Sequence, residues 1–175
     1  QGNNLKYLII FQLFFSIGFA SVLNITSFEA DFKQIVTDDK EKKLIYNGTL
    51  KALKPQFAFW NYSQPISKSI YLTSNLITII EPEIEQVIIK NIPASFNFFK
   101  MIQNAKKISK NRYTTHINDV LYTIEIEKEM IKSIMYHDEF DNKVEIIFDK
   151  QFKNRNISEE IFNPIIPQEY DIIRE

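Results

Sequence analysis

The sequence contains no cysteine, which excludes disulfides, zinc bound through sulfur, thiol catalysis and a lipid attached to a cysteine. Histidine is almost as scarce, and the two residues His116 and His137 are too few for a histidine-rich metal site. Only 3 glycines are present, which leaves little material for a loop that binds phosphate through its backbone. We therefore expect the protein to hold neither a metal ion nor a cofactor.

An excess of positive charge is also missing, because 21 lysine and arginine residues are opposed by 22 aspartate and glutamate residues. A nucleic-acid-binding protein needs clustered positive charge to displace counterions, so we expect no nucleic-acid partner. The 175 residues are 45% hydrophobic and 25% charged, a composition typical of globular proteins. This length accommodates one domain of ordinary size.

An uncharged stretch covers residues 7–20 (YLIIFQLFFSIGFA) and follows a single cation, Lys6. It is shorter than a membrane-spanning helix, and it ends in a small-x-small triplet typical of signal-peptide cleavage sites. We expect residues 1–20 to be a signal peptide that is cleaved after Ala20, which leaves residues 21–175 as one domain in the periplasm. A chain without cysteine suits that oxidising compartment. A retained signal anchor and a buried core helix are the alternatives.

Alternation of apolar and polar residues predicts β-strands through most of the remaining chain. The clearest case is the run from Val120 to Glu127, where Tyr122, Ile124 and Ile126 alternate with polar neighbours. A turn is expected at residues 38–40. The predicted strands cover residues 28–34, 44–53, 56–62, 70–73, 77–80, 84–89, 112–117, 120–127, 130–136 and 140–148, and residues 161–162 and 170–173 are expected to be extended after a polar segment at 150–158.

One segment has helical periodicity instead. Phe96, Phe99 and Ile102 recur at helical spacing after Pro93, which predicts a helix over residues 94–106. Many short strands joined by hairpin-length turns indicate an antiparallel sheet that curls into a barrel or splits into a sandwich. The predicted helix, with a possible short one near residues 21–27, is then available to cover an open side of the sheet.

Residues suited to catalysis are few and scattered. Glu81, Glu83 and Glu85 alternate and would place carboxylates on one strand face, as glycoside hydrolysis or divalent-metal binding requires. Pro82 interrupts the run, so a solvated strand edge explains these residues better. Each histidine lies beside an alternating strand and is expected at the surface. No nucleophile elbow, P-loop or dinucleotide fingerprint is present, so we do not expect an enzyme.

Aromatic residues are abundant and include 15 phenylalanines. They gather at residues 57–62, on a predicted strand, and at residues 96–99, on the predicted helix. An ordinary hydrophobic core explains this pattern. The alternative is a curled sheet around a cavity that the helix covers, where each buried methylene of an acyl chain would contribute about 0.8 kcal/mol.

An ordered series of segments resembles one family, the outer-membrane lipoprotein carriers (LolA). The series runs through residues 28–34 (FEADFKQ), 46–51 (YNGTLK), 54–62 (KPQFAFWNY), Pro65, 79–87 (IIEPEIEQV) and the ending from Ile161 through Pro167 to Ile173. The first segment is similar to the opening strand of the family. The segments from residue 46 to Pro65 are similar to its G-x-L, (R/K)-P, W-x-Y and P series. Residues 79–87 are similar to its Y-x-P-x-x-x-Q-V signature, and the ending is similar to its terminal strand. The resemblance covers nearly the whole chain after Ala20 and is greatest to epsilonproteobacterial members.

The resemblance implies a mainly β fold: an incomplete, open antiparallel β-barrel covered by a short α-helical lid. It also implies a monomeric periplasmic chaperone without enzymatic activity. Its cargo would be acylated lipoproteins, received from an inner-membrane lipoprotein-releasing ABC transporter and delivered to an outer-membrane lipoprotein acceptor.

The resemblance also implies a role for several residues. Lys54 stands where the family often has an arginine that ties the barrel to the lid, and is the candidate lid latch. Ala58 stands where the family often has a phenylalanine tied to transporter docking, and is the candidate docking position. The candidate cavity residues are Phe32, Leu44, Tyr46, Leu50, Phe57, Phe59, Trp60, Phe96, Phe99, Ile102, Tyr122 and Ile124.

Other functions are compatible with parts of the sequence. A membrane-anchored or periplasmic β-barrel module for another hydrophobic ligand shares the aromatic pattern, and a membrane-tethered structural or signalling module would use residues 7–20 as its anchor. A carboxylate hydrolase would be built on Glu81 and Glu85. An outer-membrane acceptor of the same fold would need a lipidated cysteine, which the chain lacks.

Overall fold

The computed structural model describes residues 24–73, 75–92 and 97–175. The predicted signal peptide, residues 21–23 and the candidate residue Phe96 lie outside these ranges. No helix in the described ranges is long and apolar enough to cross a membrane.

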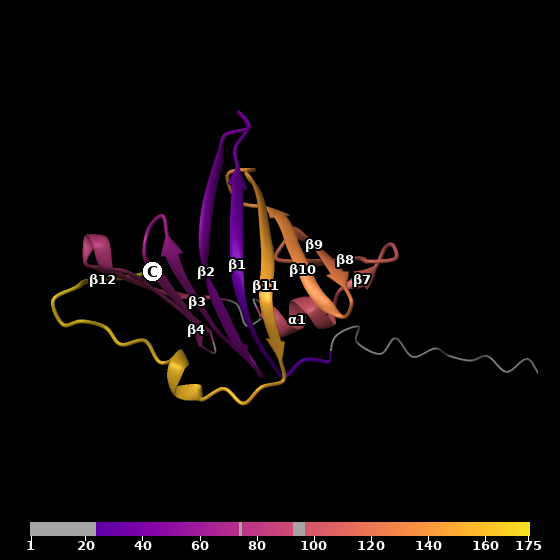
Figure 1. Ribbon diagram of the computed structural model, residues 1–175. Helices are drawn as coiled ribbons and strands as arrows, with labels where there is room; N and C mark the ends of the chain where they lie inside the picture. Colours follow the sequence, from indigo (N-terminus) through magenta and orange to yellow (C-terminus); the bar gives the residue numbers. More distant parts are fainter. Residues whose placement is uncertain (1–23, 74, 93–96) are drawn as a thin grey trace, which may run out of the picture.

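The described chain is dominated by one sheet of 12 strands (Figure 1). Along the chain these are β1 (Ser27–Thr37), β2 (Lys43–Leu53), β3 (Phe57–Gln64), β4 (Lys68–Thr73), β5 (Leu76–Glu81), β6 (Gln86–Asn91), β7 (Lys106–Lys107), β8 (Arg112–Ile117), β9 (Val120–Glu127), β10 (Met130–His137), β11 (Lys143–Lys153) and β12 (Asp171–Arg174). Their order in the sheet is β12-β6-β5-β4-β3-β2-β1-β11-β10-β9-β8-β7.

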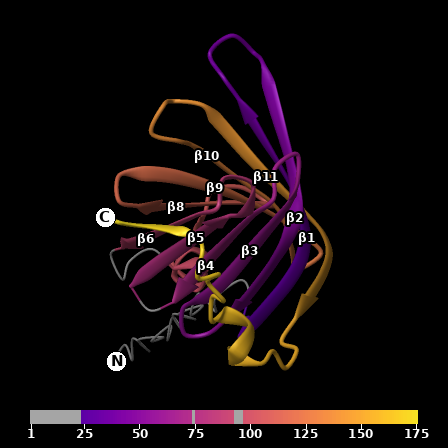
Figure 2. The same cartoon turned by 90° about the vertical axis from the view of Figure 1, so that its left-hand side faces the viewer.

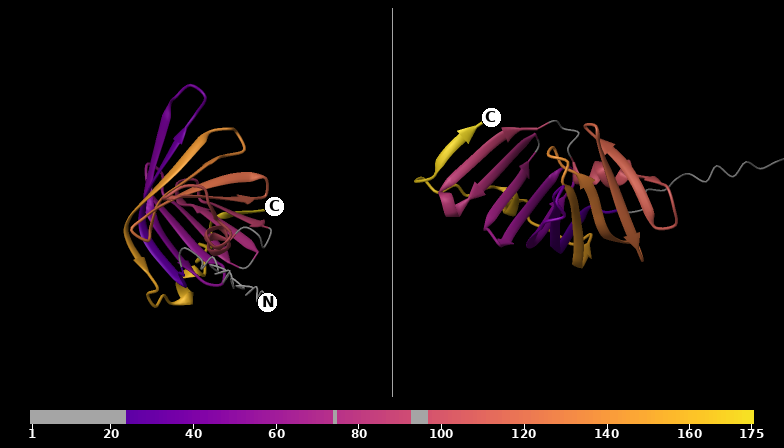
Figure 3. Two further views of the ribbon diagram at one scale, coloured as in Figure 1. Left: turned by 90° about the vertical axis from the view of Figure 1, so that its right-hand side faces the viewer. Right: turned by 90° about the horizontal axis from the view of Figure 1, so that it is seen from above.

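The sheet is strongly curved but does not close, because β12 and β7 form its two edges. Neighbouring strands are antiparallel except for β12, which runs parallel to β6. Figure 3 shows that the sheet bends around helix α1 (Phe98–Gln103), which lies against its concave side. The expected mainly β fold, an open antiparallel barrel with one short helix, is confirmed.

Two long hairpins share the same tight turn. In β1–β2 the carboxylate of Asp38 accepts hydrogen bonds from the backbone nitrogens of Lys40 and Lys42, at 3.0 and 2.8 Å. Asp138 does the same for the nitrogens of Phe140 and Asn142 in β10–β11, at 3.0 and 2.9 Å. An aspartate that caps its own turn fixes the register of a hairpin. Both hairpin tips extend beyond the neighbouring strands (Figure 2).

Asn97 determines where helix α1 begins. Its side-chain oxygen accepts hydrogen bonds from the backbone nitrogens of Phe99 and Lys100, at 2.9 and 3.2 Å, which satisfies two donors at the start of the helix. Phe99, Met101 and Ile102 are buried and face the sheet. The predicted helix is too long at its carboxyl end, because the chain turns at Asn104 and then forms β7 against β8.

A strap of residues 154–170 crosses the outer side of the sheet and connects β11 to β12 (Figure 1). It contains a 3₁₀ turn, Glu159–Phe162, so the expectation that residues 161–162 are extended is wrong. The turn is capped by Ser158, whose hydroxyl accepts from the backbone nitrogen of Glu160. It places Phe162 fully buried against Phe57, with 5.5 Å between the ring centroids.

Three smaller predictions also need correction. Ile84 belongs to a 3₁₀ turn, Pro82–Ile84, because proline begins that turn and cannot donate to the sheet. Phe140 lies in the hairpin turn before β11, where it is 77% exposed, and β11 continues to Lys153 in place of the expected polar crossing. In the described part of residues 21–27, no helix forms, and Ser27 begins β1.

Gly48 allows the aromatic core to approach the backbone. Gly48 lies opposite Phe32 on the neighbouring strand, and a Cβ atom at this position would overlap the carbonyl oxygen of Asn61 and lie 2.8 Å from the Phe32 ring. The Phe32 ring in turn packs against Trp60 and Tyr62, at 5.1 and 5.0 Å between centroids. A side chain at residue 48 would therefore displace the ring that supports both.

We predict that Gly48→Ala lowers the free energy of unfolding by about 1–3 kcal/mol, because the added methyl group overpacks this contact. Chemical denaturation followed by tryptophan fluorescence measures the change. Thr49→Ala, at the exposed neighbouring position of the same strand, is the control and should shift the midpoint much less. Equal midpoints for Gly48→Ala and the unaltered chain would contradict the prediction.

Candidate functional site

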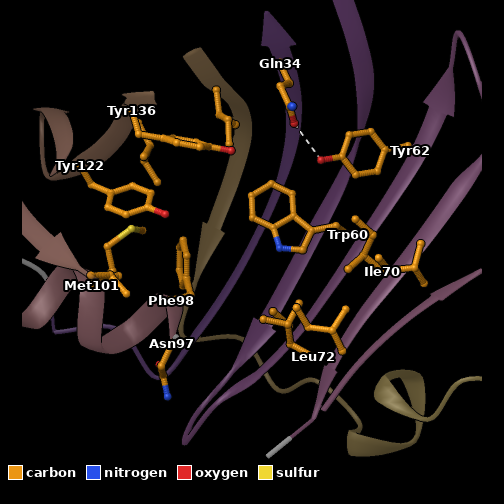
Figure 4. A pocket seen from close by; sticks show the side chains of 16 residues that line it. Gln34, Trp60, Tyr62, Ile70, Leu72, Asn97, Phe98, Met101, Tyr122 and Tyr136 are labelled. Atoms are coloured by element: carbon orange, nitrogen blue, oxygen red, sulfur yellow. Dashed lines mark hydrogen bonds between the residues drawn. The ribbon is translucent and has the colours of Figure 1, made fainter. Parts of the chain in front are cut away.

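The concave side of the sheet holds a pocket of about 270 Å³ between β3–β5, helix α1 and strands β8–β11. Its wall is mostly apolar and includes Trp60, Ile70, Leu72, Phe98 and Met101 (Figure 4). The pocket is partly open to solvent. The six-residue helix thus leaves part of the inner face of the sheet uncovered.

Strand alternation on β3 decides which aromatic residues face the pocket. Ala58, Trp60 and Tyr62 point to the concave side and line it. Phe57 and Phe59 point to the outer side, where Phe57 stacks on Phe162 and Phe59 stacks on Tyr71, at 4.5 Å between the latter ring centroids. The assignment of Phe57 and Phe59 to the cavity is therefore wrong. The sequence could not distinguish the two faces, because both are apolar.

Trp60 and Tyr122 are the candidate residues that line the pocket directly. Five others lie in the buried core that supports it: Phe32, Leu50, Phe99, Ile102 and Ile124. Whether any of these residues contacts a lipid stays a prediction.

The candidates near the hairpin tip lie outside the pocket. Tyr46 is half-buried and packs against Tyr62 with 5.9 Å between ring centroids, but it does not line the cavity. Leu44 points to the same side of β2 but is 48% exposed. Leu44 lies near the start of β2, toward the tip of the β1–β2 hairpin, and this tip extends past the neighbouring strands (Figure 2).

A hydrogen bond between the start of the helix and the β2–β3 connection comes from Asn97, which was not among the residues expected from the sequence. Its side-chain nitrogen donates to the carbonyl oxygen of Pro55 at 2.8 Å, while its oxygen caps the helix. Lys54 places its ammonium 6.0 Å from the centroid of the Phe99 ring, so its role as a latch stays a prediction. An asparagine directly before an apolar helical run was the available signal, because asparagine is a preferred N-cap.

Ala58 is not on the accessible surface. It is only 2% exposed, lies between Ala52 and Leu72 on the neighbouring strands, and forms part of the pocket wall. In this conformation its side chain cannot contact a partner protein from outside, so the docking assignment is not supported by its position.

The pocket is electrically neutral. None of the described residues that line it is charged, and its polar side-chain groups belong to Gln34, Asn97, three tyrosines and the indole N–H of Trp60. Burial, followed by the neighbouring Tyr122 and Asp138, raises the pKa of Tyr136 to about 12. Burial also raises the pKa of Tyr62 and Tyr122, so all three phenols remain protonated at physiological pH.

The residues considered for catalysis are not brought together. Glu81 pairs with Lys68 at 3.7 Å, and Glu83 accepts from the backbone nitrogen of Ser67 at 3.3 Å. His116 and His137 are exposed. Across residues 24–73, 75–92 and 97–175, no group of three histidines or carboxylates is arranged to hold a metal ion.

Asn97 provides a test of how the helix is attached. We predict that Asn97→Ala destabilises the fold by about 1–2 kcal/mol, because it removes both the cap and the bond to Pro55. Asn97→Asp keeps the capping oxygen but loses the donor, so it should restore protection of the Phe99 and Lys100 amides without restoring the bond to Pro55. Hydrogen exchange of these amides, with denaturation midpoints, separates the two contributions.

Asn104→Ala, at the other end of the helix, is the control for general effects of removing an asparagine. If Asn97→Ala leaves both exchange and stability unchanged, then Asn97 does not hold the helix in place.

Comparison with known proteins gives a consistent result. Residues 23–119 match the family model described as outer membrane lipoprotein carrier protein LolA. The outer-membrane lipoprotein carrier protein of Campylobacter jejuni subsp. jejuni is 38% identical over 169 residues, which cover 97% of this chain and 99% of that protein. The protein of the same name from Helicobacter pylori strain J99 is 33% identical over 154 residues, covering 87% and 82%.

A solved structure shares the fold at low sequence identity. The crystal structure of an uncharacterized conserved protein from Thermus thermophilus superimposes with a TM-score of 0.51 at 9% identity, covering 87% of this chain and 92% of that one. This likeness concerns the architecture of the chain alone.

Proposed function

This chain belongs to the LolA family of outer-membrane lipoprotein carrier proteins, and we propose that its concave pocket buries the acyl chains of lipoproteins during transport through the periplasm. Cargo would be received from an inner-membrane lipoprotein-releasing ABC transporter and delivered to an outer-membrane acceptor. The protein would be exported by residues 1–20 and would act through residues 21–175 as a monomer. The family and the names of its members point to a carrier rather than to an enzyme.

The observation that carries this proposal is a neutral, mostly apolar pocket beneath a short helix. Acyl chains exposed to water are costly, and transfer of each methylene into such a pocket contributes about 0.8 kcal/mol. Apolar contact is also non-directional, so an acceptor with a better-matched cavity can take the cargo without a chemical step.

The size of the pocket implies that the helix moves when cargo enters. The volume of about 270 Å³ is slightly below that of pockets that hold drug-sized ligands, which is about 300–1,000 Å³. Several acyl chains therefore require more space than this conformation provides. Helix α1 is the element to displace, because it is only six residues long and its residues Phe98 and Met101 form one wall of the pocket.

We predict that Ile70→Glu weakens acyl binding by about tenfold or more, or ~1.4 kcal/mol, because it places a charge on the apolar wall. Ile70 is only half-buried in the pocket wall, so the fold should tolerate the change. Ser69→Glu, the neighbouring position on the outer face of β4, is the matched control and should leave binding unchanged. The assay is displacement of a fluorescent acyl probe by a purified triacylated lipoprotein, with circular dichroism to verify folding.

Failure of the unaltered protein to bind the probe or to exchange it for lipoprotein would contradict the proposed function. Equal binding by Ile70→Glu and Ser69→Glu would instead show that the pocket is not the binding site.

The proposed export through residues 1–20 can be tested separately. When the full chain is expressed with a functional secretion system, the periplasmic fraction should contain a form that begins at Ser21, identified by N-terminal sequencing. A form that remains in the membrane fraction with residues 7–20 attached would favour the anchored binding module instead.

A further inference from the structure

Four polar side chains of the pocket lie toward one end, whereas Asn97 lies toward the other, where it caps helix α1 and donates to Pro55. Figure 4 shows Gln34, Tyr62, Tyr122 and Tyr136 toward one end and Leu72 toward the other. The four polar side chains come from four strands, β1, β3, β9 and β10, on the two sides of the pocket. We call these four residues the polar rim. Such convergence on one end of an apolar cavity is how binding sites fix the orientation of a ligand.

Packing holds the rim in place before any ligand arrives. Tyr62 donates to the side-chain oxygen of Gln34 at 2.8 Å, and its ring is held between Phe32 and Tyr46. The rings of Tyr122 and Tyr136 lie against each other, with 4.9 Å between centroids. Groups held in this way lose little conformational freedom on binding.

The rim also has unused hydrogen-bonding capacity. No described residue forms a hydrogen bond with the hydroxyls of Tyr122 and Tyr136 or with the side-chain nitrogen of Gln34. These groups are donors on neutral side chains, and the described lining offers no cation that would pair with a carboxylate or a phosphate. The chemistry that matches this set is an uncharged hydrogen-bond acceptor such as an ester or amide carbonyl.

We infer that the polar rim binds the ester and amide carbonyl groups at the junction where the acyl chains join the cargo, and thereby selects acylated heads that are neutral over anionic lipids. This inference rests on the proposed function, because it assumes that the apolar end holds the chains. The chains would supply affinity, while the rim would set how deeply the cargo enters. The cation described beside the rim is Lys68, whose ammonium lies 5.7 Å from the centroid of the Tyr62 ring, but it is already paired with Glu81 at 3.7 Å. An anionic head would therefore lose its hydration at the rim and would have to compete with Glu81 for this partner.

The experiment compares three probes with the same acyl or alkyl chains. A diacylglycerol carries two ester carbonyls, a dialkylglycerol ether lacks them, and a phosphatidic acid adds a negative head. We expect the unaltered protein to bind the diacylglycerol about tenfold more tightly than the ether, as expected for one or two hydrogen bonds, and to bind the phosphatidic acid more weakly than the diacylglycerol.

The variant that tests the rim is Tyr122→Phe combined with Tyr136→Phe, which removes two hydroxyls and preserves both rings. It should lose most of the preference for ester over ether. Tyr71→Phe is the matched control, because this phenol stacks on Phe59 outside the pocket, and it should keep the preference.

The outcomes are distinguishable. Equal affinity of the unaltered protein for ester and ether, a preference for phosphatidic acid, or a preference that survives in the double variant would overturn the inference while leaving lipid carriage in place. No binding of any of the three probes would count against the proposed function itself.

Discussion

The structure depends on incomplete coverage of one curved apolar face. A sheet of 12 strands that does not close presents a long concave surface, and in the described part of the chain the six-residue helix α1 lies against it. The helix buries Phe99, Met101 and Ile102, yet the wall formed by Trp60 and Ile70 remains only half-buried. A globular protein normally fills such space with its own side chains. Space left open and apolar is what a carrier of acyl chains requires.

The outer face of the same strands is covered by the protein's own chain. On this face the strap of residues 154–170 covers part of the apolar surface, and Phe162 is fully buried against Phe57. One side of strand β3 lines the pocket and the other contacts the strap. Both sides of this strand are therefore apolar. The same strand thereby contributes to stability through one face and to the pocket through the other.

Much of the architecture could be predicted from the sequence, because strands with one buried face alternate regularly. The predictions of cavity residues failed where the alternation of apolar and polar residues does not show which side chains face the pocket. Phe57 and Phe59 were indistinguishable from Trp60 because both faces of β3 are apolar, and Leu44 has the right parity but lies beyond the covered part of the sheet. The burial of Phe162 could not be predicted, because it depends on contact with Phe57, which is distant along the chain. Asn97 could have been found from its capping position, but its bond to Pro55 could not.

The central claim is that acyl chains enter the space between helix α1 and the concave face. The most direct measurement is photo-crosslinking with a lipoprotein whose acyl chain carries a terminal diazirine, followed by mass-spectrometric mapping of the labelled residues. We expect labels on pocket residues such as Ile77 and Phe98, and none on Phe59 of the outer face. Labels concentrated on the outer face, or spread evenly over both faces, would contradict this claim.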